Sequence, residues 1–444
     1  MTPPPIHTPI IPALPPADHW TLSNGLPVVS TAGVDAPVLT VELIWDAGRP
    51  YERYPMAASL TNALLLEGTQ YRSATELEVH FEQHGTSLGR PHGMDTSHLR
   101  LSCSLRHAEK LLPVVVEVIA EPGFRDKAFR RLIKRRRQRL RENLTDADTV
   151  AYRLLTEAVF GADTAYGYNA SDALYRDYSL DTLRNHFHEF YTVENATLRV
   201  VGQINAATER LLDATFGQLS TPDPPTRDRA QPHNVVAKPV PEKLIQYVRP
   251  RAQQTLIRRG RNGFLITDPD YPGLVVLDTV LGGYFGSRLM RNIREEKGYT
   301  YGIDSDLDTM RFDGTFGISA DVANENVAAV RAEILREMDK LRQDLIPAAE
   351  LDMVRAYLIG TLVQDLDGPL ATAARHRSAL LKHYDAADHL RRLDQTIRTI
   401  SAAELRELAG NYLRPELDTE VIVGGAEPLE GARIVERVDG PLTP

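Results

Sequence analysis

Histidine pairs are the first candidates for chemistry in this sequence of 444 residues, which contains 13 histidines. His80 and His84 are four positions apart in a segment that predicts a helix, so their imidazoles would share one face and could bind one metal ion. Two further pairs are His92 with His98 and His186 with His188. A hydrolytic metal site also needs a carboxylate ligand and a base that activates water, and neither is evident beside these histidines. We therefore favour a partly exposed helix face for His80 and His84.

A basic run crowds one predicted helix and raises the question of nucleic-acid binding. The run comprises Arg130, Arg131, Lys134, Arg135, Arg136, Arg137, Arg139 and Arg141. No aromatic residues are interleaved with these charges, and the chain carries a formal net charge of −9, whereas nucleic-acid binders are usually basic. We expect no nucleic-acid ligand, and we interpret the run as a solvated face or as one that pairs with acidic surface of a partner.

Cys103 is the only cysteine, which excludes an internal disulfide and a cysteine-based zinc site. It alternates with leucines, and we interpret it as a buried strand residue. Residues 1–20 are rich in proline, which interrupts the apolar helix of a secretory signal. Nowhere do eighteen apolar residues follow one another. The expectation is a cytoplasmic protein that does not contact a membrane.

A proline-rich segment divides the chain near its midpoint. Residues 219–241 hold six prolines among polar residues, which suits a semi-extended linker. The sequences on its two sides repeat one order of features: residues 179–202 and 401–424 each begin with a helix-capping serine and end with a β-branched strand and a glycine. Upstream, residues 124–140 align with 346–362, and both predict long helices. The shared order indicates an internal duplication.

Strands and helices mix within each half. The predicted strands are 38–45, 98–105, 243–248 and 312–320. The predicted helices include 56–67, 73–84, which opens with the capping box Ser73–Glu76, and 286–297, which Gly298 can end in the left-handed conformation. We predict an α+β fold of two homologous α/β-sandwich domains. The predicted parts are an N-terminal extension (1–20), an N-terminal domain (21–218), the linker (219–241), a C-terminal domain (242–430) and a tail (431–444).

Four ordered segments resemble one peptidase family. NGLPVV resembles the family's opening strand, and LLLEGTQYRSATELEVHFEQHGTSL resembles the segment that follows its zinc-binding helix. FYTVENATLRVVGQI resembles the strand that closes the first domain, and LDTVLGGYFGSRLMRNIREEKGYTYGI resembles the most recognisable stretch of the second domain. Because these segments keep the family's order over roughly residues 20–425, the sequence resembles the M16 family, which includes pitrilysin, insulinase and the mitochondrial processing peptidase.

The M16 resemblance implies a helix with the signature H-x-x-E-H, in which two histidines bind Zn²⁺ and the glutamate activates a water molecule. Counted back from the Gly-Thr pair after the helix, these positions fall on Ser59, Asn62 and Ala63. Alanine has no ligand atom, and the amide of asparagine cannot take up a proton at neutral pH. The family's downstream glutamate ligand would fall near Leu140, with Glu142 the nearest candidate. The resemblance therefore predicts a chain that binds no zinc and a partner subunit that does.

The second half retains the family's other catalytic feature. In M16 peptidases an arginine and a tyrosine seven residues apart reach the zinc site of the opposite domain, and Arg294 and Tyr301 match that pattern. A guanidinium and a phenol can donate hydrogen bonds to the charge that builds in the tetrahedral state. Gly282, Gly283 and Gly286, just upstream, would let the backbone lie close to a substrate or a neighbouring chain.

The resemblance therefore implies half an enzyme: the non-catalytic subunit of a heterodimeric M16 zinc metallopeptidase. Such a chain would be inactive alone, would hold no cofactor, and would supply Arg294 and Tyr301 in trans to a partner with an intact H-x-x-E-H during peptide hydrolysis. A homodimer could form in the absence of that partner. Two alternatives are a purely structural M16-like subunit and a stand-alone hydrolase with an atypical metal site around His80 and His84.

Overall fold

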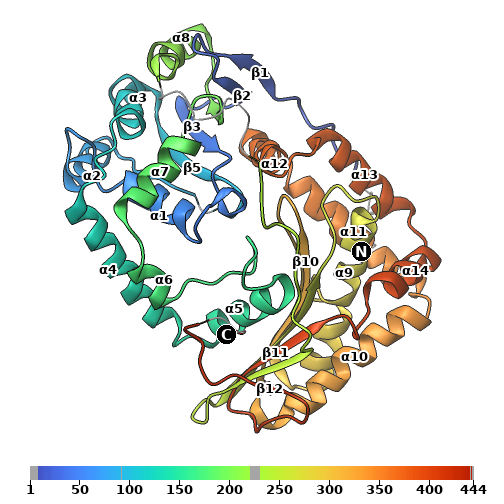
Figure 1. Ribbon diagram of the computed structural model, residues 1–444. Helices are drawn as coiled ribbons and strands as arrows, with labels where there is room; N and C mark the ends of the chain where they lie inside the picture. The colour runs from blue at the N-terminus through green and yellow to red at the C-terminus, as the bar shows by residue number, and fades with distance from the viewer. Residues whose placement is uncertain (1–8, 92, 221–230, 441, 443–444) are drawn as a thin grey trace.

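Two mixed six-stranded sheets, one from each half of the chain, form the framework of the protein (Figure 1). The computed structural model describes residues 9–91, 93–220, 231–440 and 442. The first sheet has the order β1-β2-β6-β3-β5-β4, with β1 Asp18–Thr21, β2 Pro27–Thr31, β3 Val38–Trp45, β4 Leu88–Gly89, β5 Ser97–Ser104 and β6 Ala196–Gly202. The second has the order β12-β7-β11-β8-β10-β9, with β7 Leu244–Val248, β8 Gln254–Asn262, β9 Thr300–Thr309, β10 Gly314–Ala323, β11 Thr419–Gly424 and β12 Arg433–Ile434.

The two sheets share one pairing pattern. In the first, β6 pairs in parallel with β2 and antiparallel with β3, which pairs antiparallel with β5. In the second, β11 pairs in parallel with β7 and antiparallel with β8, which pairs antiparallel with β10. The predicted α+β fold with two related halves is therefore confirmed. The predicted repeat coincides with helix α7 (Leu180–Phe190) plus β6 in one half and helix α14 (Ala402–Tyr412) plus β11 in the other.

The helices cover the sheets as the apolar periodicity requires. In the first half they are α1 Ala57–Leu65, α2 Ala74–Glu82, α3 Leu105–Ala120, α4 Asp126–Asn143, α5 Ala147–Phe160, α6 Asp172–Arg176 and α8 Ala206–Thr215, besides α7. In the second half they are α9 Tyr271–Leu281, α10 Val327–Gln343, α11 Ala348–Gln364, α12 Gly368–Lys382 and α13 Ala386–Thr399, besides α14 and a π-helix over Met290–Glu296. No helix within the described ranges combines the length and the apolar composition needed to cross a bilayer.

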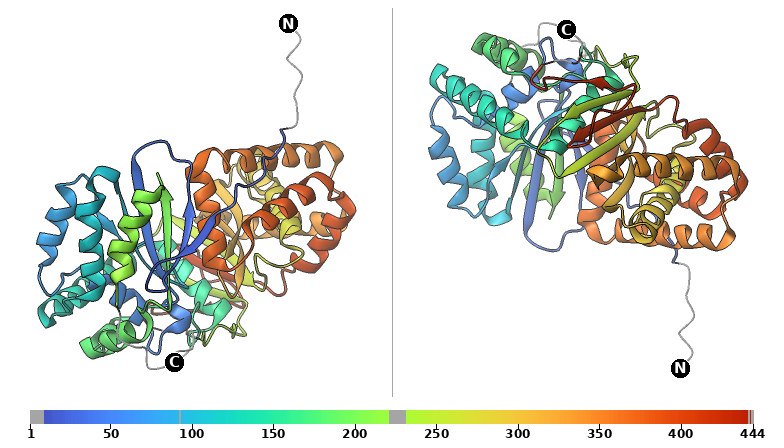
Figure 2. Two further views of the ribbon diagram at one scale, coloured as in Figure 1. Left: turned by 90° about the horizontal axis from the view of Figure 1, so that it is seen from above. Right: turned by 90° about the horizontal axis from the view of Figure 1, so that it is seen from below.

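Each half contributes a helix to the sheet of the other half. Helix α5 packs on β8 and β11 of the second sheet, and its Val150 and Leu154 share a core cluster with Ile245 and Val421. In return, α12 of the second half packs on β2 and β6 of the first sheet. Figures 1 and 2 show these two helices lying where the halves meet. All strands of the first sheet precede residue 219 and all strands of the second sheet follow residue 241, while the helical layers cross between the halves.

Both ends of the described chain pack against the fold, and the N-terminal end links the two halves. Residues 9–17 run from β1 over the second half, where Leu14 is buried in the second core and the Arg398 guanidinium donates a hydrogen bond to the Pro9 carbonyl. At the other end, the segment expected to be a tail supplies β12, which pairs in parallel with β7. Both segments therefore contribute to packing.

A buried carboxylate fastens α12 to the first sheet. Glu42 on β3 has 0% of its surface exposed, and its oxygens accept hydrogen bonds from the Arg377 guanidinium of α12 at 2.7 to 3.0 Å. Arg199 on β6 contacts the same carboxylate at 3.3 Å and donates to the Ala373 carbonyl of α12 at 2.8 Å. His98 Nδ1 lies 3.2 Å from Glu42 on the other side.

Burial by itself raises the pKa of the Glu42 carboxyl, but the hydrogen bonds from His98 and Arg377, together with their charges, outweigh it. The pKa of Glu42 is therefore held well below its ordinary value, and the group is ionised throughout the physiological range. The same burial lowers the pKa of His98.

A second contact between the halves lies at the turn between β9 and β10. Arg311 in this turn donates to Asp46 of the first half at 2.6 Å and to the Tyr51 hydroxyl at 3.1 Å. Its backbone N–H donates to the Asp95 carboxylate at 3.0 Å. Strand β9 is thereby held at its far end by the first half.

We predict that Glu42→Gln lowers the free energy of unfolding by about 3–5 kcal/mol, because Arg199 and Arg377 would remain buried without a negative partner. Urea denaturation of the full chain measures this loss. Glu142→Gln, which changes an exposed carboxylate paired only with Gln138, is the matched control and should stay within about 0.5 kcal/mol of wild type. Equal midpoints for Glu42→Gln and wild type would show that the ion network does not hold the halves together.

Candidate functional site

Helix α1, which corresponds to the zinc-binding helix of the resembled family, begins at an unusual turn. Met56 adopts φ = 76° just before the helix, and the side chain of Glu52 folds back to accept hydrogen bonds from the backbone N–H groups of Met56 at 3.0 Å and Ala58 at 2.8 Å. The Tyr168 hydroxyl donates to the same carboxylate at 2.8 Å. Glu52 thus provides hydrogen-bond acceptors for the free N–H groups at the start of α1. In most helices the side chain of the N-cap residue provides them.

Glu52 is fully enclosed by these contacts. Burial raises the pKa of its carboxyl to about 7, although the Arg49 charge and the three hydrogen bonds act in the opposite direction. The Arg49 guanidinium lies 4.3 Å above the ring of Tyr168 and donates hydrogen bonds to the carbonyls of Ala165 and Tyr168. It therefore interacts with these groups as well as with the charge of Glu52. Sequence reasoning did not single out Glu52, because only the folded chain brings it to the N-terminus of α1.

The three motif positions on α1 do not form a ligand set. Ser59 is exposed and donates to the Met56 carbonyl at 3.2 Å. Asn62 is 9% exposed, and its Oδ1 has no hydrogen-bond partner among the described residues. Ala63 is 4% exposed and belongs to the first hydrophobic core. The helix presents a hydroxyl, an amide and a methyl group where two imidazoles and a carboxylate would be needed.

The downstream candidates on α4 are equally unsuited. Leu140 is buried in the same core as Ala63, and Glu142 is exposed and accepts a hydrogen bond from Gln138 at 3.0 Å. The basic run of this helix is largely ion-paired. Arg131 and Arg135 both contact Glu67, and Arg137 contacts Asp172 at 2.7 Å.

His80 and His84 lie close together at the C-terminal end of α2. The rings of His80 and His84 are 5.3 Å apart, and His107, which the sequence did not bring to notice, lies 5.0 Å from His84. His84 Nδ1 is engaged by the His80 carbonyl at 2.8 Å, and His80 Nε2 lies 3.3 Å from the Lys110 carbonyl. Across the part of the chain that the structure describes, no three His, Cys, Asp or Glu side chains are grouped so that they could hold a metal ion.

The remaining histidines have structural surroundings or lie at the surface. His98 is part of the Glu42 network, and His186 is buried, where burial lowers its pKa to about 4 and its Nε2 lies 3.2 Å from the Ala47 carbonyl. His188 is exposed. His92 lies outside the described residues.

Arg294 is positioned by a π-helix. The N–H of Lys297 donates to the Asn292 carbonyl five residues earlier at 3.2 Å, and Gly298 then ends the element with φ = 65°, as its position predicted. Arg294 is half-buried, and its guanidinium lies 4.7 Å from the ring centre of Phe285, which is exposed. No other side-chain interaction of Arg294 occurs among the described residues.

Tyr301 is positioned by a β-bulge. Ile303 pairs with Ala320 and Thr300 with Val322, so Tyr301 and Gly302 together oppose the single residue Asp321. The Thr300 hydroxyl holds the bulge by donating to the Asp321 carbonyl at 2.5 Å and accepting from the Gly302 N–H at 3.1 Å. Bulges re-aim side chains next to functional sites, and here Tyr301 is 89% exposed on an edge strand. Its hydroxyl has no partner among the described residues.

The glycines before the π-helix have packing roles of their own. A Cβ at Gly282 would lie 2.5 Å from the Ser305 backbone nitrogen, and one at Gly283 would lie 2.9 Å from the carboxylate of Asp278. A Cβ at Gly286 would lie 2.8 Å from the ring of Tyr284. These distances explain the glycines by close packing within the chain, and a role beside a substrate remains a prediction.

Sequence comparisons find similarity to peptidases. A sequence profile for the peptidase M16 inactive domain matches residues 177–358, which include Arg294 and Tyr301. An uncharacterized zinc protease of Bacillus subtilis is 22% identical over 410 residues, covering 90% of this chain and 96% of that protein. An uncharacterized zinc protease of Mycobacterium bovis is 31% identical over 143 residues, covering 31% of this chain and 33% of that protein.

Solved structures share the fold over nearly the whole chain. A peptidase M16 inactive domain from Pseudomonas fluorescens superposes with a TM-score of 0.79 at 21% identity, covering 93% of this chain and 100% of that one. A protease from Helicobacter pylori gives a TM-score of 0.81 at 18% identity with the same coverage. The chain therefore resembles the M16 peptidase family in sequence over residues 177–358 and shares the fold of these solved structures over nearly its whole length.

The purified chain is expected to hold no stoichiometric zinc at α1, because Ser59, Asn62 and Ala63 supply neither imidazole nor carboxylate. Elemental analysis after exhaustive dialysis tests this. About one tightly held zinc ion per chain that is lost in His80→Ala or His84→Ala would contradict it and would place a metal site on α2 instead.

We also expect Glu52→Gln to be less destabilising at pH 8 than at pH 5. The pKa of Glu52 is raised in the folded protein, so the folded state binds the proton more tightly than the unfolded state. The wild-type free energy of unfolding therefore falls between pH 4.5 and about 7. Glutamine cannot titrate and removes this component. Urea titrations at the two pH values measure the difference, with the exposed Glu82→Gln as control, and an equal cost at both pH values would contradict the expectation.

Proposed function

We propose that this chain is the zinc-less subunit of a heterodimeric M16 peptidase and that it supplies Arg294 and Tyr301 to the zinc site of a partner chain. The observation that carries the proposal is the state of this pair. Arg294 lies on a π-helix and is half-buried, and Tyr301 lies on a β-bulge and is exposed. The hydrogen-bonding groups of both side chains have no partners within the described chain.

Backbone irregularity of this kind requires a reason. A π-helix has poorer hydrogen-bond geometry than an α-helix, and a bulge interrupts a ladder, so both features have a free-energy cost and are frequent at functional sites. A tyrosine that is 89% exposed contributes little to packing here. Donors held in this way can act on an oxyanion that forms in another subunit.

The state of α1 supports the assignment of this chain as the half without zinc. Ala63 is part of the hydrophobic core and Glu52 is committed to capping the helix, so α1 serves the fold. The partner would bear the intact H-x-x-E-H motif and the zinc ion, and the zinc would activate the attacking water there. In this proposal the present chain orients the peptide and stabilises the transition state.

The structural-subunit alternative uses the same fold and differs only in the role of the pair. If the chain is a scaffold, Arg294 and Tyr301 do not contact the substrate, and their substitution leaves peptidase activity unchanged. The stand-alone hydrolase has less support, because the described residues contain no group of three potential metal ligands.

Tyr301→Phe should leave the fold and the heterodimer intact while lowering kcat of the reconstituted pair by about 10²–10³, since only one donor to the oxyanion is removed. Tyr71→Phe, at another tyrosine that is 72% exposed, is the matched control and should keep full activity. The assay measures kcat and KM on an unstructured peptide, with complex formation checked by size-exclusion chromatography.

Arg294→Ala should raise KM as well as lower kcat, because a charged anchor for the peptide backbone is lost, while Arg130→Ala on the solvated face of α4 should change neither. Wild-type kinetics for both Tyr301→Phe and Arg294→Ala in an intact complex would make the pair a relic and the chain a scaffold.

A further inference from the structure

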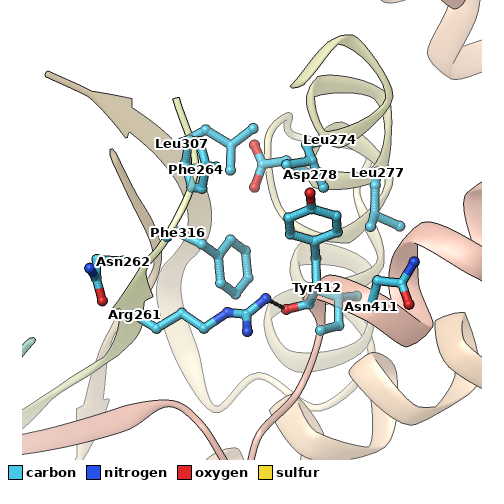
Figure 3. A pocket seen from close by; sticks show the side chains of 12 residues that line it. Arg261, Asn262, Phe264, Leu274, Leu277, Asp278, Leu307, Phe316, Asn411 and Tyr412 are labelled. Atoms are coloured by element: carbon cyan, nitrogen blue, oxygen red, sulfur yellow. Dashed lines mark hydrogen bonds between the residues drawn. The ribbon is translucent and has the colours of Figure 1, made fainter. Parts of the chain in front are cut away.

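A cavity of about 190 Å³ lies between one end of the second sheet and helices α9 and α14 (Figure 3). Its apolar wall is formed by Phe264, Leu274, Leu277, Leu307, Phe316 and Leu413. An apolar cavity of roughly 150 Å³ in another protein takes up a benzene molecule, so the space here suits one ring with a short chain attached. The cavity is separate from Arg294 and Tyr301, neither of which lines it.

One polar group of the wall is left incompletely satisfied. The Asp278 carboxylate points toward the apolar side chains in Figure 3, and one of its oxygens accepts a hydrogen bond from the Ser305 hydroxyl at 2.6 Å. Its second oxygen has no hydrogen-bond partner, and no basic side chain forms an ion pair with it within the described ranges. The nearby charges are those of Asp304 and Asp306, which are negative.

Three other polar groups of the wall already have partners inside the protein, and a fourth, Asn411, lies at the exposed rim. The Arg261 guanidinium donates to the Tyr412 carbonyl, drawn as a dashed line in Figure 3, and lies 3.9 Å from Asp418. The Tyr412 hydroxyl donates to Asp270 at 3.0 Å, and the Asn262 amide donates to Asp313 at 2.8 Å.

A carboxylate at an apolar cavity without a positive partner selects for ligands of one charge. An anion would be repelled by Asp278 and its two aspartate neighbours, and a neutral molecule would leave the carboxylate desolvated and unpaired. A cation compensates it, and a protonated amine also supplies the missing hydrogen-bond donors. Gly283 leaves room at this point, since a Cβ there would lie 2.9 Å from the Asp278 carboxylate.

We propose that this cavity binds a small molecule with an apolar, ring-sized body and one protonated amine, which pairs with the carboxylate of Asp278. The ring would lie among Phe264, Phe316 and the surrounding leucines, and the amine would replace the cation that the protein itself does not provide. The proposal concerns a ligand site distinct from the surface pair and does not depend on the chain being a peptidase subunit.

The test uses three ligands of nearly the same shape: 2-phenylethylamine, the neutral 2-phenylethanol and the anionic 3-phenylpropionate. Isothermal titration calorimetry with the full chain at pH 8 should give the tightest binding for the amine, weaker binding for the alcohol and none for the anion. Equal affinities for all three, or no binding of the amine at millimolar concentration, would overturn the proposal.

Two variants distinguish the contribution of the Asp278 charge to ligand binding from that of the cavity volume. Asp278→Asn keeps the volume and removes the charge, and it should weaken the amine about ten- to a hundred-fold while changing the alcohol little. Asn411→Trp at the exposed rim should block both ligands without altering the core. Asp352→Asn, at an exposed aspartate of α11, is the control and should leave all affinities unchanged. Undiminished amine binding in Asn411→Trp would place the ligand elsewhere and overturn the proposal, even if Asp278→Asn failed to fold.

The pH dependence of ligand affinity is a second, independent test of pairing with Asp278. Burial, followed by the charges of Asp306 and Asp304, raises the pKa of Asp278 to about 7. Tyr271 on α9, Arg261 on β8 and Tyr412 on α14 are the other titratable groups that face this region. Lowering the pH from 8 to 5 should therefore weaken the amine and leave the alcohol unaffected, whereas amine affinity that does not change with pH would contradict pairing with Asp278.

Discussion

The buried carboxylate of Glu42 is the interaction on which the architecture of this protein depends. It lies at the centre of the first sheet and binds Arg199 of that sheet together with Arg377 of α12, which belongs to the second half. A charge without exposed surface is tolerated only when its partners are close and well aligned, so this network fixes where α12 can lie. The network holds α12 on the first sheet, and apolar packing holds α5 on the second sheet.

The contacts between the halves bear on the proposed role of Arg294 and Tyr301. Arg311 fastens the far end of β9 to Asp46 of the first half, and the π-helix and the bulge project Arg294 and Tyr301 at the near end. A rigid framework can hold such donors in place without reorganisation, which is what transition-state stabilisation requires. In the first half, by contrast, α1 packs in the hydrophobic core, and Glu52 of the same half accepts hydrogen bonds from the backbone at its N-terminus.

Much of the fold could be predicted from the sequence, because its signals are local. The capping boxes at Ser73 and Ser401 and the left-handed Gly298 mark helix ends through contacts within a few residues, and all three occur as expected. The repeat on the two sides of the linker predicted two related sheets correctly. The helix exchange was not predictable in this way, since nothing local indicates that α5 and α12 pack on the sheet of the opposite half.

The candidate site was predictable in part for the same reason. The absence of ligands at Ser59, Asn62 and Ala63 follows from residue types alone, and the structure adds that Ala63 is buried and Asn62 unpaired. Glu52, Asp278 and His107 escaped notice because their significance comes from neighbours distant in the sequence, such as Tyr168 for Glu52 and Ser305 for Asp278. The sequence around an isolated acidic residue does not indicate whether its side chain will be buried.

We propose that this chain completes a peptidase site that lies in a partner chain. The most direct measurement is hydrolysis of an unstructured fluorogenic peptide by the purified chain, by an M16 chain with an intact H-x-x-E-H from the same organism, and by their equimolar mixture. The present chain alone should be inactive, and the mixture should gain chelator-sensitive activity well above that of the partner alone. Chelator-sensitive cleavage by the present chain alone, or a mixture no more active than the partner by itself, would contradict it.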